Sequence, residues 1–168
     1  MNRAAVEDVL FRHRDRLVAA WGLGAFVLSW PPRGWLPSLL PLLAGFALRL
    51  WARAHIGPHS RGRFLSSPER CAGGPYRFLA HPLYVANLLA ILAIALALAG
   101  PSLAVAGILS GPMLLYAFLG RAETRRMREL APPARTAALP RAERRLRSEW
   151  ASILPPAALW AFLQFFAP

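Results

Sequence analysis

The residue types best suited to chemistry in this chain lie just ahead of its longest uncharged run. Tyr76, His81 and Tyr84 place an imidazole and two phenols beside the stretch 82–120, which contains no Asp, Glu, Lys, Arg or His. These side chains hydrogen-bond and stack, so together they can bind a polar ligand. Glu123 is the first acid beyond the run. We predict a polar site where the two ends of the run meet, with one wall open to water and one to an apolar phase.

The length of the run explains how its two ends can meet. A bilayer core needs about 20 helical residues per crossing, so the run holds two crossings, at 82–99 and 101–120. Gly100-Pro101 between them is a turn that allows only an antiparallel hairpin. A hairpin returns the chain to the side that it left. The flanking segments 52–81 and 121–150 are therefore predicted to lie together and to form the site.

The composition indicates a membrane protein rather than a soluble one. Of the 168 residues, 56% are hydrophobic and 17% are charged, whereas soluble domains average about 45–50% and about 25%. A soluble domain of this size could not bury so much apolar surface. The formal charge of +12 and the 20 arginines, with no lysine, fall mainly between apolar segments. This grouping predicts anionic lipid head groups as partners and no nucleic acid.

We predict an all-α, polytopic membrane protein that forms one domain over 1–168, with about five transmembrane helices and a central helical hairpin. Its predicted parts are an interfacial helix at 1–16, membrane segments at 17–30, 35–51, 82–99, 101–120 and 151–166, and cytosolic segments at 52–81 and 121–150. Within the last segment, 131–140 is predicted to be a loop and 141–150 a short basic helix on the membrane surface.

The placement of the arginines predicts the orientation. Four arginines fall in 1–16, five in 53–77 and nine in 121–147, against one in 31–34 and none in 99–102. Because basic loops stay on the cytosolic side, the N-terminus is predicted to be cytosolic. The use of arginine alone, together with abundant alanine and leucine, is typical of GC-rich bacterial genomes. We therefore expect a multi-pass protein of a bacterial inner membrane.

Two blocks of sequence resemble a known family. One block is Gly74-Pro75-Tyr76 followed by Ala80-His81-Pro82-Leu83-Tyr84-Val85-Ala86-Asn87, and the other is Leu48-Arg49-Leu50-Trp51-Ala52 with His55-Ile56-Gly57. They are similar to the membrane methyltransferases typified by isoprenylcysteine carboxyl methyltransferase and the phospholipid N-methyltransferases. The resemblance spans about residues 45–130. It implies transfer of the methyl group of S-adenosylmethionine (SAM) to a lipid or lipid-linked small molecule at the cytosolic face.

The resemblance also implies a cofactor-binding set. His81 and Tyr84 would bind SAM, Tyr76 would lie beside its ring, and Glu123 would hold its ammonium group. Pro82 and Leu83 complete this set, Leu83 mainly through its backbone.

Asn87, Arg121 and Arg125 are the predicted substrate-binding residues, and the catalytic residue is left unknown. No metal is expected, because Gly57-Pro58 breaks the helical spacing of His55 and His59. The single Cys71 excludes an intrachain disulfide.

Departures from the family pattern favour an alternative. The arginine expected before His-Pro is Ala80, the second of two expected glutamates is Thr124, and the expected substrate-side arginine falls on Leu119. A non-catalytic relative that serves as a structural or partner-binding membrane protein therefore stays open. A reductase of the sterol type with a nicotinamide cofactor is a further alternative, although no phosphate-cradling element is visible.

Several of these residues could instead have a purely structural role. His81 precedes Pro82, a favoured first helical residue, and so could simply occupy the cap position. Tyr76 and Tyr84 could be interfacial aromatic residues. Glu123 could be a solvated charge, and Asn87 could bond a neighbouring helix.

Overall fold

The computed structural model describes residues 3–55, 73–130 and 150–167. Within these ranges the chain is entirely helical, as the sequence predicts. The helices are α1 Arg3–Leu28, η1 Leu36–Ser38, α2 Leu39–His55, η3 Gly74–Arg77, α3 Pro82–Ala99, α4 Leu103–Leu130 and α6 Trp150–Phe165, where η marks a 3-10 helix. The predicted segments 131–140 and 141–149, and residues Cys71 and His59, lie outside the described residues.

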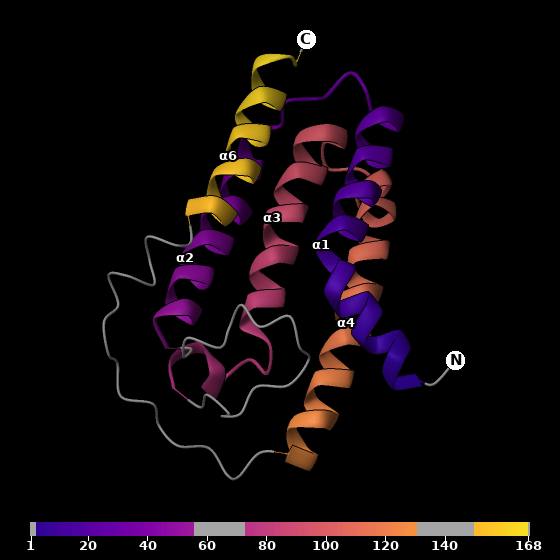
Figure 1. The fold of residues 1–168 in the computed structure, drawn as a ribbon. Coiled ribbons are helices and arrows are strands. Elements are labelled where there is room, and N and C mark those ends of the chain that lie inside the picture. The colour runs from indigo at the N-terminus through magenta and orange to yellow at the C-terminus, as the bar shows by residue number, and fades with distance from the viewer. Residues whose placement is uncertain (1–2, 56–72, 131–149, 168) are drawn as a thin grey trace.

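The predicted central hairpin is present as α3 and α4 (Figure 1). Gly100, at φ +62°, ends α3 with a bond from its N–H to the Leu96 carbonyl, a conformation that glycine adopts without strain. Ala95, Ala99 and Val105 form the buried contact next to the turn. Both helices are long and apolar enough to cross a membrane.

Helix α3 is central, with α2, α4 and α6 packed around it (Figure 1). A Cβ on Gly45 of α2 would lie 2.9 Å from the Ala86 carbonyl oxygen and 3.1 Å from Leu89 Cβ. The missing side chain therefore lets the α2 and α3 backbones approach closely. On the other side, Leu163 of α6 is buried against Ala97 and Leu98.

A proline and a tryptophan join α1 to α4. Pro112 lies inside α4 and has no N–H for the Ile108 carbonyl one turn earlier. The Trp21 indole Nε1–H of α1 donates to that carbonyl at 2.8 Å. A Cβ on Gly111 would lie 2.7 Å from the Trp21 ring, so glycine makes room for the indole.

Large apolar side chains cover the outside of the helices. Leu23 is 65% exposed, Leu40 70% and Leu114 73%. Exposed apolar surface on this scale is stable against lipid tails rather than water. Together with the two long apolar helices, it indicates a membrane protein.

The helix boundaries differ from the predicted ones in several places. The predicted segment 35–51 is an α-helix only from Leu39, after the 3-10 helix η1, and this helix continues to His55. The predicted interfacial segment 1–16 and first crossing 17–30 form one continuous helix, since the change from polar to apolar residues near Leu17 does not interrupt the backbone hydrogen bonds. Helix α4 continues past Gly120 to Leu130. Helix α6 begins at Trp150, ahead of Pro155-Pro156. The number of crossings and the side of the N-terminus stay predictions.

The helix ends assemble the predicted site. The C-terminal ends of α2 and α4 and the N-terminal end of α3 lie at one end of the bundle, at the bottom of Figure 1. We call this the His81 end, after the residue that precedes α3. The connection between α1 and α2 lies at the opposite end.

Candidate functional site

His81 bridges the two helices of the hairpin. Its Nδ1 lies 3.3 Å from Glu123 Oε2, and its Nε2 lies 2.8 Å from Thr124 Oγ1. The His81 and Glu123 side chains are 19% and 23% exposed. The predicted meeting of the two flanking segments is therefore confirmed for these residues.

The neighbours of His81 determine how its protons are arranged. A carboxylate only accepts hydrogen bonds, so Glu123 favours a proton on Nδ1 of His81. In the neutral imidazole Nε2 then accepts from the Thr124 hydroxyl. His81 does occupy the cap position of α3, but its side chain makes no capping hydrogen bond. The cap position thus explains the backbone conformation of His81, but it does not explain why the imidazole ring contacts α4.

Gly120 lets the imidazole lie against α4. A Cβ at this position would be 3.1 Å from His81 Cδ2. Such a contact is tighter than side chains ordinarily tolerate, so any larger residue would push the ring away from Glu123 and Thr124.

Three rings form a column that leads from His81 into the bundle. His81 stacks on Tyr84 with ring centroids 5.4 Å apart, and Tyr84 stacks on Tyr116 of α4 at 5.0 Å. The Glu123 carboxylate acts on the Tyr84 hydroxyl through its charge and a hydrogen bond. Tyr84 also packs against the buried cluster of Phe11, Leu119 and Ala122. It is therefore part of the core of the site and not a surface aromatic.

A second polar group lies deeper, beyond the column. Arg49 of α2 donates from Nη1 to Asn87 Oδ1 at 2.7 Å, and Asn87 Nδ2 donates to the Tyr116 hydroxyl at 3.3 Å. Asn87 thus bonds both neighbouring helices, as its structural explanation predicts. Sequence reasoning did not assign Arg49 or Tyr116 to the site. The detectable signal was a charged residue and a phenol within otherwise apolar segments.

The remaining predicted cofactor residues lie at the start of α3 and on η3. Pro82 is buried at the first position of α3, and Leu83 is partly buried. Tyr76 is held on η3, which begins at Gly74 with φ +56°. A Cβ on Gly74 would lie 2.6 Å from the His55 ring, so the glycine allows η3 to sit on the end of α2.

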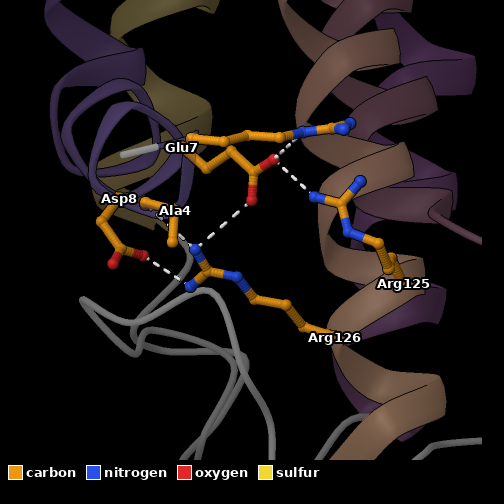
Figure 2. A network of polar contacts seen from close by, with 6 residues as sticks. Ala4, Glu7, Asp8, Arg125 and Arg126 are labelled. Atoms are coloured by element: carbon orange, nitrogen blue, oxygen red, sulfur yellow. Dashed lines mark hydrogen bonds and ion pairs between the residues drawn. The ribbon is translucent and has the colours of Figure 1, made fainter. Parts of the chain in front are cut away.

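Arg125 is directed away from the His81 group, toward α1. Figure 2 shows Arg125 and Arg126 reaching from α4 to Glu7 and Asp8. Arg126 lies 2.6 Å from Asp8 Oδ1 and 3.4 Å from Glu7 Oε2. The predicted substrate role of Arg125 remains a prediction, because its guanidinium already pairs with the Glu7 carboxylate in this structure. Arg121, the other arginine predicted to bind substrate, is exposed.

Glu7 is the buried centre of this ion-pair group, with a side chain only 2% exposed. Burial raises the pKa of Glu7, but the hydrogen bond and charge of Arg125, joined by Arg3 and Arg126, outweigh it, so the pKa lies below its usual value near 4.5. The group fixes the N-terminal half of α1 beside Glu123 and Thr124. Phe11, one turn further along α1, completes this wall against Leu119.

No group of three or more metal-binding side chains occurs within residues 3–55, 73–130 and 150–167.

The comparisons with known proteins agree with the geometry. The family model of the phospholipid methyltransferases matches residues 35–130, which is more than half of the chain and runs from η1 through α4. The match includes His81, Tyr84, Asn87 and Glu123, and it ends before α6. No curated protein and no solved structure gives a significant match. The chain belongs to the phospholipid methyltransferase family, a family of membrane methyltransferases.

Proposed function

We propose that this protein transfers the methyl group of SAM to a lipid or lipid-linked small molecule at the cytosolic face of the membrane. The observation that carries the proposal is His81 held between Glu123 and Thr124, where the two apolar helices meet. A polar group of this kind, at the end of a lipid-covered hairpin, suits a reaction between a water-soluble cofactor and a lipid.

The residues present fit SAM. Its ammonium group needs an acid, and Glu123 is partly buried and borders the His81 ring. Its adenine ring needs aromatic cover, which His81 or Tyr76 can supply, while Tyr84 supports the His81 ring from behind. Its carboxylate needs a cation, and Arg121 is exposed at the same end of α4. We assign Pro82 and Leu83 to the wall beneath the cofactor.

Bound SAM supplies an electrophilic methyl group on a sulfonium centre. The residues of the chain would bind and orient the cofactor and keep water out, which is most of what an in-line methyl transfer requires. The Glu7–Arg125–Arg126 group holds the wall formed by α1, and the column of rings separates the cofactor from the apolar interior. Asn87 lies on the far side of that column, where an acceptor would arrive from the membrane.

A binding measurement tests the proposal. The protein in lipid nanodiscs is titrated with SAM by calorimetry, and transfer of a radiolabelled methyl group into the lipid extract is measured in parallel. His81→Ala and Glu123→Gln are each expected to weaken SAM binding about tenfold or more, the value of a hydrogen bond to a charged group. Glu129→Gln is the matched control, because Glu129 is an exposed acid on the same helix. Absence of saturable SAM binding in every lipid composition would refute the proposal.

The topology forms part of the proposal. We propose five crossings with the N-terminus and the His81 end in the cytosol of a bacterium and the protein in its inner membrane. The arginine distribution supports this orientation. Single cysteines at Glu129 and Ser102, in a Cys71→Ser background, should react with an impermeant thiol reagent from opposite sides of the membrane. Labelling of both from the same side would overturn the orientation.

The alternative is a non-catalytic relative that binds a partner or supports membrane structure. It is favoured by Thr124, which already bonds His81 Nε2 where the family pattern expects a second acid. In that case His81→Ala would leave the cellular phenotype unchanged, and substitutions on outward helix faces would abolish co-purification with a partner.

A further inference from the structure

Arg49 occupies an unusual position for a charged residue. It lies near the end of the predicted membrane segment 35–51 and six residues before α2 ends at His55. A charged residue at such a position is commonly paired or lines a polar cavity, which makes Arg49 a candidate functional residue.

The hydrogen bonds that start from Arg49 have a defined direction. A guanidinium only donates, so the Asn87 side chain presents its oxygen to Arg49, at 2.7 Å. The Asn87 amide group then points to Tyr116 and donates to the Tyr116 oxygen. Each residue in this series therefore donates to the next one, from Arg49 to Asn87 and from Asn87 to Tyr116.

In this series of hydrogen bonds, the Tyr116 hydroxyl proton has no acceptor. The Tyr116 oxygen accepts from Asn87, and within the described residues the hydroxyl donates to no acceptor. The Tyr116 side chain is 5% exposed. A buried donor without an acceptor costs free energy, and the missing partner is commonly a ligand or water.

Charges of both signs act on the Tyr116 hydroxyl. Asp15 is the strongest of the charges acting on it, and Arg14 and Arg49 oppose it. The Asp15 side chain is 82% exposed and pairs with Arg14 at 3.7 Å. Solvent screens an exposed acid of this kind, so Arg49 and the Tyr116 hydroxyl are the groups of this set that can donate to a ligand at its inner face.

This donor group borders the proposed cofactor site. The Tyr116 ring stacks on Tyr84, which stacks on His81. The Arg49–Asn87–Tyr116 group thus lies on the membrane side of the column of rings, and Glu123 lies on the other side. A molecule bound there would reach the site from the lipid.

We propose that Arg49, Asn87 and Tyr116 form an acceptor subsite that binds an oxyanion, either a phosphate diester or a carboxylate, of the lipid that receives the methyl group. This inference rests on the proposed methyl transfer. Arg49 supplies the charge, and the Tyr116 hydroxyl donates to an oxygen of the ligand. A cationic group is disfavoured, because it would meet the like charge of Arg49.

Single-chain amphiphiles test the subsite without a methyl-transfer assay. Dodecyl methyl phosphate (a phosphate diester), dodecanoate and dodecyltrimethylammonium share a tail and differ in the head group. Each is titrated by calorimetry into the full-length protein in a neutral maltoside detergent. We expect saturable binding of the phosphate or the carboxylate, and the tighter of the two identifies the oxyanion.

Three variants locate the binding. Arg49→Met is expected to weaken anion binding about tenfold, and Tyr116→Phe, which keeps the ring column, about fivefold. Arg128→Met removes the same charge from an exposed position on α4 that has no role in the proposed site, and it should leave binding unchanged. If Arg49→Met does not fold, Arg49→Lys and Tyr116→Phe carry the test.

Two results would overturn the inference: equal weakening by Arg49→Met and Arg128→Met, or binding of the trimethylammonium amphiphile as tight as that of the anions. SAM titration of the same samples separates the two proposals. If the protein binds SAM but shows no preference for anions, only the subsite is refuted. If it binds the anions but not SAM, the proposed function is refuted.

Discussion

The bond between Trp21 and the Ile108 carbonyl allows a direct test of how α1 is attached to α4. Trp21→Phe keeps an aromatic ring over Gly111 and removes the indole N–H that donates at 2.8 Å. Because Pro112 has no N–H, the Ile108 carbonyl would then have no donor. No water is present in the hydrocarbon region to replace that donor.

The expected loss of stability follows from the Ile108 carbonyl, which is left without a hydrogen-bond donor. Leaving an acceptor unsatisfied where no water reaches it costs about 1–3 kcal/mol, so we expect Trp21→Phe to lower the free energy of unfolding by about 2 kcal/mol. In a Pro112→Ala background the residue at position 112 supplies its own N–H to Ile108. There Trp21→Phe should cost only the smaller ring contact, about 0.5 kcal/mol. The two substitutions are thus coupled by about 1.5 kcal/mol.

Unfolding in mixed micelles, followed by circular dichroism as the fraction of dodecyl sulfate rises, measures all four forms. Trp150→Phe is the control, since Trp150 is 58% exposed and its replacement should change little. An equal cost of Trp21→Phe with and without Pro112 would refute this account of the attachment, because the carbonyl would then have another donor.

Two further predictions concern the site. Gly120→Ala should weaken SAM binding about tenfold by displacing His81, while stability holds or rises because alanine favours helix. Gly107→Ala has no atom within 4 Å of the new Cβ and should leave SAM binding unchanged, so equal effects of the two would contradict the role of Gly120. Glu7→Gln should lower thermal stability at neutral pH by weakening the pair with Arg125. The lowered pKa of Glu7 means that its stabilisation is present above the usual value near 4.5 and is lost as the pH falls through the lower folded value. The thermal midpoints of wild type and variant should therefore converge in acid, and a difference independent of pH would contradict this.

Much of the backbone could be predicted because its signals are local. The run from Pro82 to Ala99 was predicted as a crossing and is helix α3 with the same bounds. Proline favours the first helical position and Gly100 the turn, whatever packs around them. The change expected near Leu17 leaves no break in α1, because hydropathy predicts where a helix meets lipid and not where its hydrogen bonds stop.

The meeting of His81 with Glu123 was also predictable, since it follows from hairpin topology alone. The bond of His81 to Thr124 was not, because it depends on how far α4 is rotated about its axis. The sequence offered Arg121 and Arg125 as equivalent candidates for a substrate. They differ in the structure, because Arg125 meets Glu7, 118 residues away.

By itself, the sequence determined the helical class, the central hairpin and the family, because hydropathy, prolines, glycines and short motifs act over a few neighbouring residues. Only the tertiary structure decided which polar groups become partners. Arg49 reaches Asn87 because Gly45 lets α2 and α3 approach, and Glu7 is buried because α1 crosses the end of α4. These contacts depend on helix rotation and crossing, which the packing of the whole bundle sets.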